Sequence, residues 1–220
     1  MGKTMITGGL GFVGAYLVRS LNHQGTELTV ISRSRNAHFD SISQLRGVRV
    51  VIKDLSELTE DDLDGVDRVY HLASTVHNYH IQTDPYVDVK TNVEGTIRLL
   101  EIARRLGRPE VIFASSWFVY GRQDVLPVRE DAHCRPLALY GATKLCAEHC
   151  LRSYGAVFGI PFKIVRLGNV IGPGDINASA QKGALLHLLR KIKASEPVAL
   201  YYGGDFIRDY IYVEDAVRGL

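Results

Sequence analysis

The 220-residue sequence has little of what marks membrane, secreted or nucleic-acid-binding proteins. Its three cysteines, Cys134, Cys146 and Cys150, are too few and odd in number for a disulfide framework, which favours a reducing, cytoplasmic location. The longest uncharged runs, 4–18 and 69–83, are shorter than the roughly 20 apolar residues of a membrane span, so no membrane insertion is expected. A formal charge of +2 does not predict nucleic-acid binding.

Short β-prone runs alternate with longer helical patterns, and no repeat or low-complexity linker interrupts them. Strands are expected at residues 4–7, 28–32, 48–52, 68–72, 110–114 and 162–166, and helices at 11–23, 85–106 and 140–158. Several of these strands are apolar on both faces, as parallel strands covered by helices are. The alternation predicts an α/β protein with a Rossmann-type, doubly wound parallel sheet in residues 1–166, the expected NAD(P)-binding domain.

The pattern changes after Arg166. Residues 168–174 are expected to form a loop, and residues 181–193 one further amphipathic helix. The sequence stops within 213–220, which has the pattern of the opening of a helix. Residues 167–220 are therefore predicted to be the beginning of a small C-terminal substrate-binding lobe, and the chain a truncated protein.

A glycine trio follows the first predicted strand and opens the first helix. Gly8, Gly11 and Gly14 lack Cβ atoms, so a pyrophosphate could approach backbone N–H groups at the positive end of that helix. The alternative is a tight strand-to-helix turn that binds nothing. The position directly after the first strand favours a dinucleotide site, although the spacing is one residue longer than the usual fingerprint.

The end of the second predicted strand bears on the choice of cofactor. An acidic residue there bonds the ribose 2′-hydroxyl of NAD, whereas an arginine accommodates the 2′-phosphate of NADP. This chain has Ser32, Arg33, Ser34 and Arg35, with no carboxylate. NADP is therefore preferred over NAD, with solvated surface arginines as the alternative interpretation.

Tyr140 and Lys144 lie four positions apart, which places them on one face of a helix. A phenol with a reference pKa of about 10 acts as acid or base near neutral pH only if a positive charge stabilises the phenolate, and Lys144 can supply it. The alternative is that Tyr140 and Lys144 are two solvent-facing side chains without a catalytic role.

Cys146, His149 and Cys150 share this helix without a second ligand pair nearby, so packing is favoured over a metal site.

These features occur together with further ordered motifs. They are Asp54-Leu55, His71-Leu72-Ala73, Asn92-Val93-Glu94-Gly95-Thr96, Ala114-Ser115-Ser116-Trp117-Phe118-Val119-Tyr120-Gly121, Arg166 with Asn169, and Arg208-Asp209-Tyr210-Ile211-Tyr212-Val213. With the glycine trio and Tyr140/Lys144, they make the sequence resemble the extended short-chain dehydrogenase/reductase family, along the whole chain. Within that family it is similar to the NAD(P)-dependent nucleotide-sugar epimerase, dehydratase and reductase branch.

The resemblance implies a catalytic set of Ser116, Tyr140 and Lys144. Tyr140 would be the general acid/base, and Lys144 would lower its pKa and hold the nicotinamide ribose. Ser116, rather than Ser115, would bond the reacting oxygen. Asn169 and Arg208 would hold the substrate diphosphate, and for Arg208 the forked guanidinium independently suits phosphate.

The resemblance also assigns the cofactor site, in which Asp54 and Leu55 would meet the adenine, Ala73 would line the pocket and Asn92 would support its own helix. The residues expected to bind the cofactor are Gly8, Gly11, Phe12, Val13, Gly14, Ser32, Arg33, Arg35, Asp54, Leu55, Leu72, Ala73, Ser74, Asn92, Tyr140 and Lys144. Related proteins commonly dimerise through two helices per subunit, so a homodimer is expected through residues 85–106 and 140–158.

Two departures from the branch bear on the reaction. Trp117 and Phe118 stand where dehydratases carry an Asp-Glu pair, which disfavours dehydration. Ser32 stands where epimerases that retain NAD carry an acidic residue, which adds weight to reduction. The expected activity is hydride transfer on a nucleotide sugar, by 4-keto reduction or by epimerisation through a keto intermediate.

Two other functions remain open, one catalytic and one non-catalytic. A reductase of a steroid-like or flavonoid-like alcohol would leave Asn169 and Arg208 superfluous. A catalytically silent cofactor-sensing or RNA-binding relative would not need Ser116, Tyr140 and Lys144.

Overall fold

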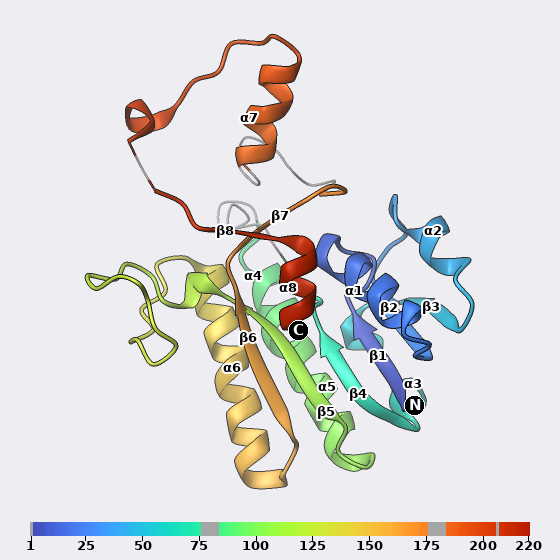
Figure 1. Ribbon diagram of the computed structural model, residues 1–220. Helices are drawn as coiled ribbons and strands as arrows, with labels where there is room; N and C mark the ends of the chain where they lie inside the picture. Colours follow the sequence, from blue (N-terminus) through green and yellow to red (C-terminus); the bar gives the residue numbers. More distant parts are fainter. Residues whose placement is uncertain (1, 76–83, 176–183, 206) are drawn as a thin grey trace.

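A parallel sheet forms the centre of the molecule. The computed structural model describes residues 2–75, 84–175, 184–205 and 207–220. The strands of the sheet are β1 (Lys3–Thr7), β2 (Leu28–Ser32), β3 (Val48–Ile52), β4 (Val66–His71), β5 (Glu110–Ser116) and β6 (Phe162–Leu167). Their order is β3-β2-β1-β4-β5-β6, and every neighbouring pair is parallel (Figure 1). This order confirms the predicted doubly wound Rossmann-type sheet.

Apolar side chains cover both faces of the sheet, as adjacent β1 residues illustrate. Met5 belongs to one core cluster with α5 (Gly95–Arg105) and α6 (Leu139–Phe158). Ile6 points to the opposite face and belongs to a second cluster with α1 (Phe12–His23) and α8 (Val213–Gly219). Both side chains are fully buried, because successive residues of a strand point to opposite faces. The sheet is therefore a rigid middle layer whose strand ends are held in fixed positions.

The single helix expected over residues 85–106 is instead divided. It begins as α4 (Tyr86–Asp88), passes through the π-helical turn η3 (Val89–Glu94), and continues as α5. A π-helical turn inserts an extra residue and rotates the side chains that follow it, and such turns are frequent at functional sites. The remaining short elements are α2 (Phe39–Ser43), η1 (Leu55–Glu57), α3 (Glu60–Leu63), η4 (Trp117–Val119), α7 (Ala184–Lys193) and η5 (Tyr201–Gly204).

The prediction of a loop over 168–174 is wrong. Within it, β7 (Asn169–Ile171) pairs in parallel with β8 (Tyr210–Tyr212). The β-branched Val170 and Ile171 favour a strand, but the partner lies about forty positions later in the sequence, which local patterning does not show. The helix expected over 181–193 is α7, and residues 181–183 lie outside the described residues.

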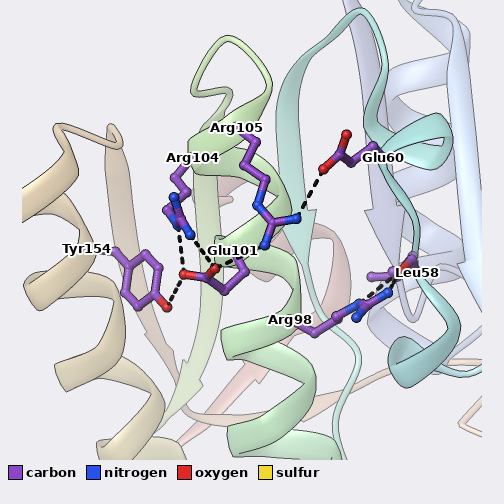
Figure 2. Close-up of polar contacts among 7 residues, drawn as sticks. All are labelled: Leu58, Glu60, Arg98, Glu101, Arg104, Arg105 and Tyr154. Atoms are coloured by element: carbon purple, nitrogen blue, oxygen red, sulfur yellow. Dashed lines mark hydrogen bonds and ion pairs between the residues drawn. The ribbon is translucent and has the colours of Figure 1, made fainter.

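A polar cluster ties α5 to α6 and to the segment before α3 (Figure 2). The Glu101 carboxylate accepts hydrogen bonds from Arg104 at 2.8 and 2.7 Å and from the Tyr154 hydroxyl at 2.7 Å. These bonds lower the pKa of Glu101 to about 2. Arg98 donates twice to the Leu58 carbonyl, at 2.9 and 2.7 Å.

Among the described residues, no helix combines the length and apolar character needed to cross a bilayer.

Candidate active site

A cleft of about 610 Å³ runs along the carboxyl ends of the strands. Ligands of open parallel sheets bind at this edge, where the strand order reverses between β1 and β4. The residues predicted for the site that line this cleft are Gly8, Gly11, Phe12, Val13, Gly14, Ser32, Arg33, Asp54, Leu55, Leu72, Ala73, Ser74, Ser116, Tyr140, Lys144, Asn169 and Arg208. The structure thus brings together most of the predicted residues, drawn from segments far apart in the sequence.

The glycine trio forms a cradle in which side chains would collide with the backbone. Gly8 has a φ of +72°, and a Cβ there would lie 2.6 Å from the Ala73 backbone nitrogen. A Cβ on Gly14 would lie 2.3 Å from the Gly8 carbonyl oxygen. Helix α1 starts directly after Gly11, whose position has no side-chain cap. This open, positively polarised helix end fits the pyrophosphate of a dinucleotide.

The far end of the cleft contains the residues expected around the adenosine. Asp54 accepts a hydrogen bond from the Ser56 N–H at 3.0 Å, and this bond, with the nearby Arg33 charge, lowers the pKa of Asp54. Arg33 lines the cleft, but Arg35 does not, because its guanidinium lies over the Phe39 ring, 4.5 Å from the centroid. The structure therefore does not place Arg35 at the cofactor site.

Tyr140 is in the first turn of α6 and lines the cleft together with Ser74 and Ser116. Burial raises the pKa of Tyr140, and the hydroxyls of Ser74 and Ser116 oppose this effect only in part. In the polypeptide alone, burial thus has the larger effect on the phenol, and the lowering by Lys144 that the resemblance implies stays a prediction. The physical reason for the raised pKa is desolvation, which the spacing of Tyr140 and Lys144 cannot reveal.

Lys144 is buried one turn further along α6, with 1% of its surface exposed. Its ammonium donates to the Ala114 carbonyl at 2.7 Å and lies over the Phe113 ring, 4.5 Å from the centroid. Burial lowers the pKa of Lys144 to about 7, although the Glu148 carboxylate acts in the opposite direction. The side chain can therefore change its charge near neutral pH.

The two adjacent serines of β5 have separate partners. The Ser115 hydroxyl donates to Glu148 at 2.6 Å, and Glu148 is also paired with Arg166 at 2.9 and 2.7 Å. Burial would raise the pKa of Glu148, but the Arg166 and Ser115 hydrogen bonds lower it below its usual value. The Ser116 hydroxyl instead accepts from the Phe118 N–H at 3.4 Å, and it lowers the pKa of Tyr140. Ser116 is thus the hydroxyl next to the phenol, and Ser115 supports a buried ion pair.

A model of the NAD-dependent epimerase/dehydratase family matches residues 4–220 of this sequence. The chain belongs to this family. In sequence it is 27% identical over 216 residues to a putative UDP-glucose 4-epimerase from Methanocaldococcus jannaschii, covering 97% of this chain and 70% of that protein. It spans from about half to seven-tenths of the length of the curated relatives that it matches.

Solved structures of similar fold agree with this family. The UDP-N-acetylglucosamine 4-epimerase from Methanobrevibacter ruminantium M1, in complex with UDP-N-acetylmuramic acid, superposes with a TM-score of 0.92 at 25% identity, over 99% of this chain and 71% of that one. MoeE5 in complex with UDP-glucuronic acid and NAD superposes with a TM-score of 0.86 at 31% identity, over 99% of this chain and 70% of the MoeE5 chain.

In this family member, Asn92 does not line the cleft. It is 1% exposed in η3, where its side-chain oxygen accepts from Ser74 at 2.9 Å and from the Thr75 N–H at 3.2 Å. Its amide donates to Thr143 at 3.0 Å. Asn92 therefore supports the residues around Tyr140 and does not reach a cofactor directly.

Sequence reasoning named His71 in a motif but did not predict its role as a buried histidine beneath the site. The His71 ring bonds with Thr7 at 2.7 Å and Thr96 at 3.0 Å, and Thr96 donates to the Asn92 carbonyl at 2.6 Å. Burial, assisted by the Lys144 charge, lowers the pKa of His71 to about 3. A neutral imidazole thus connects β1 with η3. His71 within an apolar strand was the available signal.

The end of the cleft next to Tyr140 combines residues of β7, β8 and the turn after β5. The Asn169 amide donates to the Asp209 carbonyl at 2.8 Å, which joins it to the Arg208 segment. Trp117 and Phe118 line the cleft, with the Phe118 ring edge-on to Tyr140 at a centroid distance of 5.7 Å. Further lining residues that sequence reasoning did not single out for the site are Ser34, Asn36, Lys53, Thr91, Asp175, Leu185 and Tyr210.

Proposed function

We propose that this chain binds a nicotinamide dinucleotide and epimerises a UDP-sugar through a keto intermediate. The observation that carries the proposal is the convergence of Ser116 and Tyr140 at the end of a cleft that begins at the glycine cradle. Relatives named as UDP-sugar 4-epimerases support the substrate class. Because the chain spans only part of their length, the activity of the whole protein is included in this proposal.

The chain's own residues would hold the reactants and move one proton. The cradle of Gly8 and Gly14 binds the pyrophosphate, and Lys144 contacts the nicotinamide ribose. Tyr140 takes the proton of the sugar hydroxyl and later returns it, while Ser116 hydrogen-bonds the same sugar oxygen. When bound, the nicotinamide supplies the site that accepts and returns the hydride. Reduction of the keto sugar from its opposite face would invert the carbon.

We propose that NADP is preferred over NAD. Arg33 lines the cleft next to Ser32, where no carboxylate is present to bond a ribose 2′-hydroxyl. MoeE5, a structural neighbour, was solved with NAD, so the two cofactors have to be compared directly. Arg33→Asp should weaken NADPH binding about tenfold to a hundredfold, the range for one hydrogen bond to a charged group, and leave NADH binding unweakened. Equal NADPH affinity of both proteins in calorimetry would exclude this role.

Dehydration is disfavoured in the proposed activity. Trp117 and Phe118 line the cleft directly after Ser116, and neither side chain can donate or accept a proton for water loss. The Tyr140 phenol beside Ser116 would suffice as the acid/base group for oxidation of an alcohol and reduction of a ketone.

The experiment that tests the function is an assay of UDP-glucose, UDP-glucuronic acid and UDP-N-acetylglucosamine, each with NAD or NADP, followed by proton NMR of the sugars. Formation of a 4-epimer without net consumption of cofactor is expected. Stoichiometric reduction of the cofactor, with a keto sugar as the product, would instead show a net oxidoreductase whose reverse reaction is keto-sugar reduction. No hydride transfer with any sugar, together with intact cofactor binding, would favour the non-catalytic alternative.

Three further properties belong to this proposal. Residues 1–166 would form the cofactor domain and residues 167–220 the beginning of the substrate lobe. The chain would form a homodimer through α5 and α6, which the hydrogen bond from Tyr154 to Glu101 joins (Figure 2). A cytoplasmic location is supported by three cysteines that are all unpaired.

A further inference from the structure

Two aromatic side chains, Trp117 and Phe118, lie beside the proposed acid/base group. Both line the cleft, and the centroids of their rings are 4.5 Å apart. The Phe118 ring in turn meets the Tyr140 ring edge-on at a centroid distance of 5.7 Å. The three rings therefore form a row that begins at Tyr140. The proposed reaction gives Trp117 and Phe118 no task, because neither side chain exchanges a proton.

The local fold holds this aromatic pair in place. The turn η4 starts directly after β5, and the Phe118 N–H donates to the Ser116 hydroxyl at 3.4 Å. From the other side, a Cβ on Gly141 of α6 would lie only 2.7 Å from the Phe118 carbonyl oxygen. Phe118 is thus positioned both by Ser116 and by the first turn of α6. Trp117 keeps 36% of its surface exposed, so a ligand in the cleft can cover it.

The place of the pair determines which part of a sugar would meet it. In the proposed reaction the C4 hydroxyl lies at Tyr140 and Ser116, so the groups on the neighbouring carbons C3 and C5 come next to these residues. In hexoses C3 carries a hydroxyl, whereas C5 and C6 form an edge that is rich in C–H groups. Aromatic rings bury such apolar groups favourably. The C5–C6 edge is therefore the part of the sugar that suits Trp117 and Phe118.

The cations of the cleft have other places. Among the described residues that line it, the lysines and arginines are Arg33, Lys53, Lys144 and Arg208. Arg33 and Lys53 follow β2 and β3, at the adenosine end. Lys144 donates to the Ala114 carbonyl at 2.7 Å, and Arg208 is expected at the diphosphate. A carboxylate on C5 would thus lose its water against two aromatic rings without gaining a cation, which is costly.

We propose that Trp117 and Phe118 select the UDP-sugar by the group on C5. The site prefers the methyl of a 6-deoxyhexose, accepts the hydroxymethyl of a hexose, and rejects the carboxylate of a uronic acid. A methyl group is buried by the rings and brings no polar atom that must be paired. The indole N–H of Trp117 is one neutral donor and does not replace the water shell of a carboxylate. This inference rests on the proposed function, because it requires a UDP-sugar at Tyr140.

The test measures binding separately from turnover. UDP-6-deoxyglucose, UDP-glucose and UDP-glucuronic acid differ only at C6, and each is titrated by calorimetry into the protein with its oxidised cofactor bound. UDP alone gives the reference affinity. UDP-6-deoxyglucose should bind about threefold to tenfold more tightly than UDP-glucose, and about a hundredfold more tightly than UDP-glucuronic acid.

The fluorescence of Trp117 reports the contact itself, because Trp117 is the only tryptophan of the sequence. UDP-6-deoxyglucose should shift its emission to shorter wavelength than UDP does, since the sugar then covers the exposed indole. An emission that the UDP-sugars change no more than UDP does would place the sugar away from Trp117 and overturn the proposal.

Three variants separate the ring from its position. Trp117→Ser should reduce the affinity ratio between UDP-6-deoxyglucose and UDP-glucuronic acid about tenfold, whereas Trp117→Phe, which keeps an aromatic ring, should stay within about threefold of the wild-type ratio. Phe158→Ser is the matched control. It removes an aromatic side chain of nearly the same exposure, 37%, at the far end of α6 and outside the cleft, so the ratio should not change.

The outcomes distinguish this inference from the proposed function. Equal affinities of the wild type for the three UDP-sugars, tighter binding of UDP-glucuronic acid, or a wild-type ratio in Trp117→Ser would overturn the inference and leave the proposed function standing. Selective binding without epimerisation would support the inference and refute only the reaction. Binding of the cofactor but of no UDP-sugar would refute the proposed function and this inference with it.

Discussion

Burial acts on the two titratable side chains at the start of α6 by disfavouring the charged form of each. It raises the pKa of Tyr140 and lowers that of Lys144 to about 7. In the protein alone, both groups are therefore shifted towards neutrality. A site of this kind holds its proton on the phenol until a bound reactant changes the local charge, which suits a group that must both take and return a proton.

Tyr140→Phe is expected to remove most of the turnover. The change deletes only the hydroxyl and keeps the ring that packs edge-on against Phe118. Loss of a general acid/base should lower kcat about 10²- to 10⁴-fold, while the dissociation constant of the cofactor changes little. Steady-state kinetics and cofactor titration measure the two effects separately. Full activity of the variant would contradict the assignment of Tyr140.

Lys144 should make the stability of the protein rise with pH. Its pKa is about 7 in the folded state against 10.5 without the fold, so between these values the unfolded chain binds more protons. The free energy of unfolding should therefore increase through this range, by at most about 1.4 kcal/mol per pH unit from this group.

Lys144→Met provides the reference for this effect, because it removes the titration and keeps an unbranched apolar side chain. Urea unfolding of both proteins from pH 7 to pH 10 should show the wild type gaining stability relative to the variant. A constant difference across that range would show that burial does not depress the pKa of Lys144.

At the level of elements, the turn between β1 and α1 depends on close backbone contact. The Gly14 position of α1 faces the Gly8 carbonyl so closely that no side chain fits without movement. The same contact brings the helix end near the strand edge, where the pyrophosphate would bind. Both the packing of α1 against the strand edge and the binding of a ligand there therefore depend on the absence of a Cβ atom at Gly14.

Gly14→Ala should lower the free energy of unfolding by about 1–3 kcal/mol, as overpacking does, and should also weaken cofactor binding. Gly219→Ala is a matched control, because it adds the same methyl to a helix with nothing within 4 Å. Its stability should stay within about 0.5 kcal/mol of the wild type. Equal stability of both variants in urea titrations would contradict the predicted collision.

At the scale of the whole molecule, the outer surface of α5 and α6 is where self-association is proposed. Tyr154 and Glu101 join the two helices, and Val157, on the same part of α6, is 68% exposed. Arg104 lies over the Phe158 ring at 5.3 Å, which holds a second apolar side chain beside it. A mixed apolar and charged surface on two joined helices is suited to an interface.

Val157→Glu should therefore convert a dimer to a monomer, because a carboxylate would be buried in the interface without a partner. Val125→Glu makes the same change at a position that is 79% exposed in the segment before α6. It should leave the mass unchanged in sedimentation equilibrium. A wild-type protein that sediments as a monomer at micromolar concentration, or a Val157→Glu protein that stays dimeric, would exclude this surface.

Local patterns in the sequence were sufficient for the sheet and the ends of its helices. The run of Val, Ile and Leu in β2 predicts a buried parallel strand, and the glycines at positions 8, 11 and 14 predict a turn that approaches a ligand. Gly159, with a φ of +70°, ends α6 where expected. Each of these features depends on residues close together in the chain, so propensity and spacing determine them.

Tertiary structure decided what depends on distant partners. The pairing of β7 with β8, the division of the 85–106 helix and the stacking of Arg35 on Phe39 all require contacts that spacing does not encode. The direction of the Tyr140 pKa shift is a further example, because desolvation is set by the whole shell of neighbours, while the sequence shows only which groups are available.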